Sequence, residues 1–148
     1  MKQIFPIVPA GNGPVWFFVG FAIFLLCLIA LFGYLIYSSR NASFEIDSGE
    51  LKISGEIYGR RIPLSSFQLQ KAKIVNLNVD REYRMKWRTN GTGLPGYSAG
   101  WFRLYNGDKC LAFVTDRSHV VYLPTSNGYS LLLSVKDPEA FLRAVRGS

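Results

Sequence analysis

The chain has 148 residues and a net charge of +7, and 49% of its residues are hydrophobic while 18% are charged. Disordered chains combine low hydrophobicity with high charge, and disulfide scaffolds need more than the two cysteines found here, so both classes are excluded. The excess of Lys and Arg favours an acidic partner.

The hydrophobic residues gather in residues 14–37, a run of 24 residues without a charged side chain. As a helix this run would span roughly 36 Å, enough for the roughly 30 Å hydrocarbon core of a bilayer. Trp16 lies near one end and Tyr34 and Tyr37 near the other, as in the aromatic belts of membrane helices. The sequence therefore predicts a transmembrane helix over residues 14–37, between a tail over residues 1–13 and a linker over residues 38–42.

A cleaved signal peptide is the alternative interpretation of this run. Its apolar region should hold about 7–15 residues, after a basic start and before a small-x-small cleavage site. Here the run is longer, Lys2 is the only basic side chain before it, and no such site ends it. A lipoprotein signal at Cys27 is excluded because Leu26 precedes it and ten apolar residues follow. We therefore expect a permanent single-pass anchor.

Residues 43–148 are predicted to form one mainly-β domain, because short runs of β-forming residues alternate with turn signals. In the run over residues 75–87, apolar side chains occupy most odd positions, and Arg81 interrupts them, so we expect a turn near residues 78–82. Asn106-Gly107 supplies the positive φ angles that a tight hairpin needs. The predicted strands cover residues 43–47, 51–53, 56–62, 75–87 (split by that turn), 101–105, 109–115, 120–123 and 129–135.

The end of the chain predicts a helix over residues 137–146. Asp137 can cap it, Pro138 suits the first helical position, and Glu139 suits the positive end of the helix dipole. An apolar stripe at helical spacing follows, made of Phe141, Leu142 and Val145. We therefore expect an antiparallel sheet system closed by one C-terminal helix.

Several segments occur in the order found in one family. They are the step over residues 62–67, the glycine-rich stretch over residues 88–97, Gly100-Trp101-Phe102, the Asn106-Gly107 hairpin, and the ending over residues 132–142. Over residues 43–146 the chain resembles the bacterial pleckstrin-homology-like (PH-like) domains. The resemblance implies a partly open antiparallel barrel of about seven strands, capped by a C-terminal α-helix and often carried by membrane-anchored bacterial proteins. It implies no ligand, since the family has no common substrate.

Searches for catalytic, cofactor and metal residues give no candidate. One histidine and two cysteines cannot build a Cys/His zinc site, because Cys27 lies in the predicted membrane helix. Asp116, Ser118 and His119 suggest a triad, but neighbours in a strand would point to opposite faces. Residues 91–96 match G-x-G-x-x-G without the βαβ context that nucleotide binding requires. We therefore expect no enzyme, no cofactor and no metal, and the lack of a base-stacking motif argues against nucleic acid.

The glycine-rich stretch is the first candidate for a contact with a partner. Its apolar tip and glycines predict an exposed loop, and loops carry function more often than other segments. The alternative is a turn that only reverses the chain. The candidate partner-contact residues are Gly91, Gly93, Leu94, Pro95, Gly96 and Tyr97.

A basic strand is the second candidate. Arg84, Lys86 and Arg88 alternate with Met85 and Trp87, so one strand would place three cations on one face. Near an anionic leaflet each cation contributes about 1 kcal/mol of attraction. The alternative is a solvated outer face, since mixed charge is ordinary on protein surfaces.

The predicted function is a non-enzymatic, membrane-anchored scaffold module that presents its PH-like domain to a protein partner or to a second copy. Sensing of anionic lipid through Arg84, Lys86 and Arg88 is the alternative. We expect the bacterial inner membrane as the location. The basic charge near the anchor hardly differs between its two sides, but the free Cys110 and the basic domain favour the cytoplasmic side.

Overall fold

The computed structural model describes residues 1–55 and 57–148, apart from the side chain of Ser39. The chain divides into two compact units, residues 1–37 and residues 38–148. The predicted strand over residues 56–62 begins at Glu56, which lies outside the described residues.

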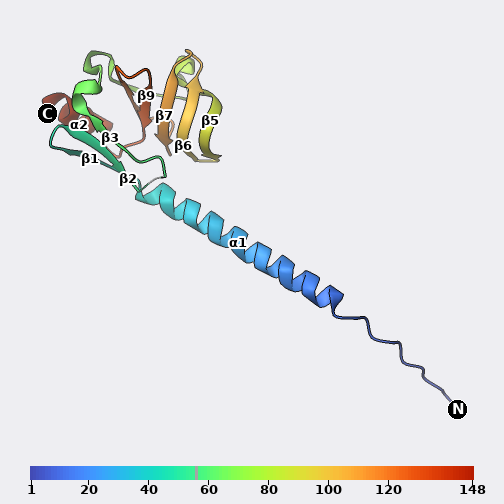
Figure 1. Cartoon of the computed structure of the whole chain (residues 1–148). Coiled ribbons are helices and arrows are strands. Elements are labelled where there is room, and N and C mark those ends of the chain that lie inside the picture. Colours follow the sequence, from blue (N-terminus) through green and yellow to red (C-terminus); the bar gives the residue numbers. More distant parts are fainter. Residues whose placement is uncertain (56) are drawn as a thin grey trace. The chain divides into compact units, whose positions relative to one another are not determined.

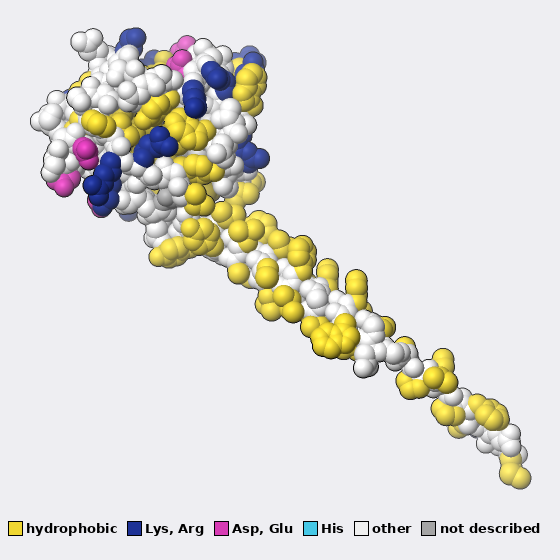
Figure 2. Space-filling model, in the orientation of Figure 1, with side chains coloured by type: hydrophobic (Ala, Val, Ile, Leu, Met, Phe, Trp, Pro, Cys, Tyr) yellow, Lys and Arg dark blue, Asp and Glu magenta, His cyan; other side chains and the backbone are white. Residues whose placement is uncertain are grey.

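A long apolar helix, α1 (Gly13–Asn41), holds the predicted membrane span. Its residues Gly13–Ser38 are long and apolar enough to cross a bilayer, and hydrophobic side chains cover the helix (Figure 2). The helix continues through most of the residues predicted as a linker, because residues 38–41 contain no proline or glycine to end it.

The second unit contains a small antiparallel sheet with the strand order β1-β2-β3. Its strands are β1 (Ser43–Asp47), β2 (Glu50–Ser54) and β3 (Arg61–Pro63). The turn between β1 and β2 is tight, and Ser48 and Gly49 adopt the positive φ angles, 51° and 80°, that such a turn needs. A turn at residues 57 and 58 replaces the middle of the predicted strand over residues 56–62, and Pro63 lies inside β3.

A six-stranded sheet forms the rest of the domain, and its strands β5, β6 and β7 run side by side (Figure 1). The strand order is β4-β8-β9-β7-β6-β5, so β4 and β5 are the edges. The strands are β4 (Lys73–Val75), β5 (Met85–Leu94), β6 (Tyr97–Leu104), β7 (Lys109–Val114), β8 (Val120–Pro124) and β9 (Ser130–Leu133). Short 3-10 turns connect the parts, at Leu64–Ser66, Leu69–Lys71 and Arg81–Tyr83.

The central strands β7, β8 and β9 of the six-stranded sheet are buried on both faces. One face packs against the small sheet and against α2 (Pro138–Gly147), through side chains such as Leu51, Leu133 and Val145. The opposite face carries Phe102, Leu104, Cys110, Ala112, Val114 and Leu132, and residues of the β4–β5 connection, namely Leu77 and Tyr83, pack against them. Because both faces are covered, β7, β8 and β9 are almost continuously apolar.

The predicted fold class is confirmed: an apolar N-terminal helix precedes a β-rich domain whose sheets do not close, and a helix ends the chain. Two details differ from the prediction. The described residues form nine strands instead of about seven, and β7 pairs with β9 in parallel. The parallel pair arises because the β8–β9 hairpin inserts between β4 and β7, an arrangement that local turn signals do not reveal.

The helix cap is also confirmed. The Asp137 carboxylate accepts a hydrogen bond of 2.9 Å from the Ala140 N–H, and Pro138 occupies the first turn of α2. The predicted turn after β4 is present at residues 77–79, but Val79 and Trp87 are exposed, so the alternation over residues 75–87 does not continue as one core-facing strand.

Candidate functional site

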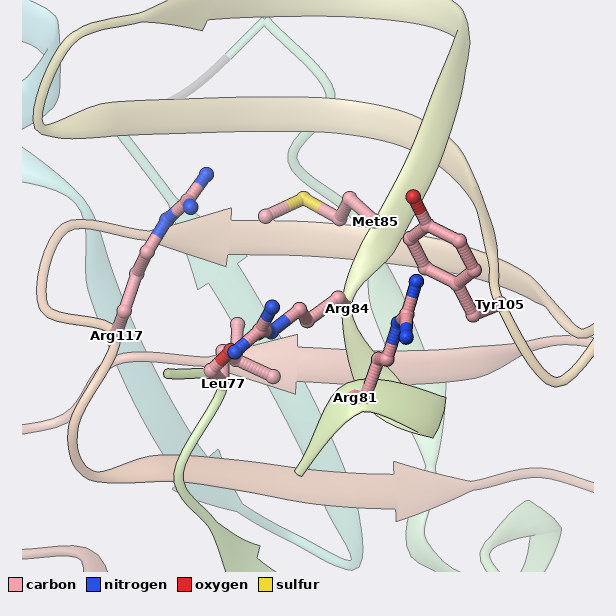
Figure 3. Close-up of a pocket in the computed structure, with 6 residues that line it drawn as sticks. All are labelled: Leu77, Arg81, Arg84, Met85, Tyr105 and Arg117. Carbon is pink, nitrogen blue, oxygen red and sulfur yellow. The ribbon is translucent and has the colours of Figure 1, made fainter. Parts of the chain in front are cut away.

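A hollow of about 300 Å³ lies where the β4–β5 and β7–β8 connections meet, and three arginines line it (Figure 3). In this view Arg117 stands on one side and Arg81 with Tyr105 on the other, while Arg84 and Met85 lie between them. Leu77 completes the lining. A hollow with three guanidinium groups is suited to an anion.

Arg84 is held in place by the backbone of the β4–β5 connection. Its Nε donates a hydrogen bond of 2.5 Å to the Leu77 carbonyl, and its Nη2 donates to the Asn78 carbonyl. The guanidinium is therefore oriented by the fold, and its Nη1 is outside both of these bonds. Arg84 links residues 77 and 78 of the β4–β5 connection to the start of β5, so it has a structural role in addition to its charge.

The two other arginines come from separate turns. Arg81 begins the 3-10 turn Arg81–Tyr83, and its guanidinium carbon lies 5.8 Å from the centre of the Tyr105 ring. Arg117 lies in the bend between β7 and β8, and its carbonyl accepts a hydrogen bond of 2.8 Å from the Leu77 N–H. The hollow thus depends on contacts between three segments that are distant in the sequence.

Within the described part of the chain, no carboxylate lines this hollow or pairs with its arginines. Three acids are chain neighbours of these arginines: Asp80 and Glu82 flank Arg81, and Asp116 precedes Arg117. The Asp116 carboxylate accepts hydrogen bonds from the Ser118 hydroxyl at 2.6 Å and the Ser118 N–H at 2.8 Å. These two bonds lower the pKa of Asp116 below its ordinary value, so it is a fixed anion beside the hollow.

Two further hollows extend the surface along β5. One, of about 300 Å³, is lined by Lys86, Trp87, Arg88 and Leu94 among others, and the next, of about 400 Å³, lies at the tip of the β5–β6 hairpin. Arg117 lines all three. We call this surface the basic face, defined by Arg81, Arg84, Lys86, Arg88 and Arg117. In Figure 2, Lys and Arg side chains lie among hydrophobic ones over the region of β5 to β7.

The two candidate contacts predicted from the sequence, the glycine-rich stretch and the basic strand, therefore lie on one surface. Lys86 and Arg88 are exposed on β5, and Lys86 lies 4.8 Å from the centre of the Trp87 ring. Arg84 lies just before β5 and not on it, and register irregularities fall between Met85 and Trp87 and again after Arg88.

The prediction of a glycine-rich loop needs a similar correction. Gly91 and Gly93 lie inside β5, Leu94 ends it, and only Pro95 and Gly96 form the turn before β6. Tyr97 begins β6 and is buried, with 9% of its surface exposed. Gly91 serves a close approach of two strands, because a Cβ atom on it would lie 2.4 Å from the Ala99 carbonyl oxygen.

Arg81 and Arg117 were missed as site residues. In the sequence, Arg81 interrupts the apolar alternation over residues 75–87, and Arg117 lies between Asp116 and Ser118. Arg81 lies three positions before Arg84, but Arg117 lies 33 positions after it, and only the tertiary fold brings Arg117 to the other two.

Residues 117–119 form a bend and not the strand expected there, so Asp116, Ser118 and His119 lie close together. There the Ser118 Oγ lies 2.6 Å from Asp116 Oδ1 and 3.0 Å from His119 Nδ1. In a catalytic triad the histidine joins the other two groups, whereas here the serine does. No group of three metal-binding side chains was found in the described ranges either.

A family model described as "Bacterial PH domain" matches residues 42–148. Searches of the curated proteins and of the solved structures returned no match to this chain. The matched range coincides with the unit that begins at Ser38, apart from its first four residues.

Proposed function

Since this chain belongs to the bacterial PH-domain family, we propose that it is a non-catalytic, membrane-anchored binding module whose basic face docks an acidic protein segment. The observation that carries the proposal is the set of three hollows that share Arg117 as a lining residue: five cations line them, and no described lining residue is a carboxylate. α1 supplies a segment long enough to act as the anchor.

The chemistry of this surface favours a protein over other partners. Arg, Trp, Tyr and Met are enriched at the centres of protein interfaces, and the basic face presents Trp87 and Tyr105, which are 53% and 49% exposed, beside Met85. A second copy would bring the same cations against themselves, so self-association through this face is disfavoured by charge repulsion. An acidic segment of another protein would pair its carboxylates with the cations and place its side chains in the hollows.

The experiment is site-specific photo-crosslinking in bacterial cells that produce the full chain. A photo-reactive amino acid at Trp87 or Leu94 should capture a partner protein. Lys86→Glu with Arg88→Glu should remove that adduct, because two contacts change from attraction to repulsion. The matched control is Lys71→Glu with Lys109→Glu, two exposed lysines outside the basic face, and it should leave the adduct unchanged. Equal loss in both double variants would contradict the proposal.

Anionic lipid is the second candidate, and one observation favours it. Tyr97 and Thr115 line both the hollow at the hairpin tip and a further hollow that includes Arg40, a residue directly after the apolar segment. Within the domain, the hairpin tip and the residues that follow the anchor therefore lie at one end. Slower amide exchange in β5 in nanodiscs of phosphatidylglycerol than in phosphatidylcholine, reversed by salt, would support lipid contact.

The proposed location is the inner membrane, with the domain on its cytoplasmic side. The buried free thiol of Cys110 and the basic surface are the reasons, since the cytoplasmic leaflet is the anionic one. Reporters fused after Ser148 test this: one that is active only inside the inner membrane should give signal, and one that is active only outside should not. The reverse result would place the domain in the periplasm and would direct the crosslinking to envelope proteins.

A further inference from the structure

We propose that the hollow between Arg81, Arg84 and Arg117 is a binding site for the phosphate group of a small phosphate monoester. This site is the part of the basic face that does not include Lys86 and Arg88, and phosphate can bind there whether or not a protein segment docks along β5. A volume of about 300 Å³ is at the lower end of the range for small-molecule pockets, so a compact ligand fits it best.

The number of charges selects the ligand. Three guanidinium groups line the hollow, and no described lining residue offsets them. A carboxylate brings one negative charge, whereas a phosphate monoester brings about 1.5 to 2 at neutral pH together with three acceptor oxygens. The planar fork of arginine matches pairs of phosphate oxygens, so three arginines from three directions can engage a tetrahedral group.

The site is organised before a ligand arrives. Two backbone carbonyls orient Arg84, the Leu77 N–H holds the Arg117 backbone at 2.8 Å, and the Tyr105 ring lies beside Arg81 at 5.8 Å. Less side-chain freedom is lost on binding when the donors are already held. The fully buried Leu77 and the half-buried Met85 form apolar walls, which exclude water from part of the hollow and strengthen charge interactions there.

The three arginines also carry an electrostatic cost that a bound anion would remove. Three like charges share one hollow without a paired carboxylate in the described chain, so their repulsion opposes folding. A dianion bound there converts this repulsion into attraction. We therefore expect phosphate to raise the thermal stability of the protein, since a ligand that binds only the folded state stabilises it.

The test uses the full chain in phosphatidylcholine nanodiscs at constant ionic strength. Inorganic phosphate and glycerol 3-phosphate are titrated against acetate, with binding followed by calorimetry and stability by the unfolding temperature. Arg81→Gln and Arg117→Gln should each weaken phosphate binding by at least about tenfold, the effect of losing one charge-assisted pair. Arg84→Lys keeps the charge but loses the fork, and it should weaken binding as well.

The control is Arg143→Gln, which removes an exposed arginine from α2, away from the hollow. It should leave phosphate binding unchanged. The proposal is overturned if acetate binds as well as phosphate, or if Arg143→Gln weakens binding as much as Arg117→Gln does. Loss of the partner adduct in the Lys86 and Arg88 variant with phosphate binding intact would separate this site from the proposed docking function.

A second experiment decides whether the phosphate group belongs to a lipid headgroup or to a soluble metabolite. Nanodiscs with phosphatidic acid, whose headgroup is a phosphate monoester, are compared with nanodiscs of equal phosphatidylglycerol content. Protection of the residue 115–119 segment from amide exchange by phosphatidic acid alone, lost in Arg117→Gln, would assign the site to a lipid headgroup. Binding of soluble phosphate without that protection would assign it to a free metabolite. Equal protection by both lipids, with no soluble binding, would overturn the site.

Discussion

Replacing Gly100 with alanine should destabilise the domain strongly, because two strands meet there without room for a side chain. Gly100 lies in β6 opposite Gly91 of β5, and its φ of 119° is a conformation that L residues rarely adopt. An added Cβ would lie 2.5 Å from the Gly91 Cα and 2.6 Å from the Asn90 carbonyl oxygen. Both are backbone atoms, so relief requires the β5 strand itself to move.

Two costs add in this variant. The disfavoured φ costs about 1–3 kcal/mol, and the forced separation of packed backbone costs about 1–3 kcal/mol more. The sum of about 2–6 kcal/mol is a large part of the roughly 5–15 kcal/mol that stabilises an ordinary domain. Because β5 carries Lys86 and Arg88, the same displacement should also weaken binding at the basic face.

The assay is urea unfolding of the full chain in detergent micelles, with Gly96→Ala as the matched control. Gly96 also has a positive φ, 75°, but an added Cβ would meet nothing within 4 Å. That control should lose only about 1–2 kcal/mol, the cost of the backbone conformation alone. If Gly100→Ala proves no less stable than Gly96→Ala, the close approach of the two strands is not what requires glycine.

Three further predictions concern stability and thiol chemistry. Asp137→Ala removes the 2.9 Å bond to the Ala140 N–H and should lower the free energy of unfolding by about 1 kcal/mol, while Asp137→Asn should retain most of it. Leu132→Ala leaves a cavity at a fully buried position and should lower the free energy of unfolding by about 2–5 kcal/mol, measured by urea unfolding. A decrease below about 1 kcal/mol would contradict the packing described for the sheet. Burial raises the pKa of the Cys110 thiol above its ordinary value of 9.0, so the folded chain keeps this proton while the unfolded chain loses it. The contribution of Cys110 to the free energy of unfolding should therefore be complete below about pH 9 and should decrease as the pH rises. The decrease should be less steep in Cys110→Ala. Fast reaction of the Cys110 thiol with a labelling reagent in the folded protein would refute its burial.

Local chemistry made several elements predictable. The absence of charge over residues 14–37 is sufficient for a long apolar helix, and Asn106-Gly107 dictates a hairpin because Gly107 takes a φ of 91°. Asp137 and Pro138 predict the start of α2. Asp137 supplies the capping hydrogen bond, and Pro138 has the φ angle that the first turn of a helix needs. In each case the decisive interaction joins residues that are neighbours in the chain.

The basic face was predictable only in part. Lys86 and Arg88 could be named, because their charge and spacing are visible in the sequence. These two residues lie on one surface with the hairpin tip and Arg117 because β5 pairs with β6 and β6 with β7, and local sequence patterns do not predict that pairing.

The sequence alone determined the anchor-like helix, the mainly-β domain, the C-terminal helix and the excess of positive charge, since hydrophobicity, turn chemistry and charge are properties of short segments. The tertiary structure alone decided the insertion of β9 beside β7, the glycine contact between β5 and β6, and the three-arginine hollow. Those features depend on contacts between distant segments. Their free energy comes from burial of both faces of the central strands of the sheet, which local sequence patterns do not specify.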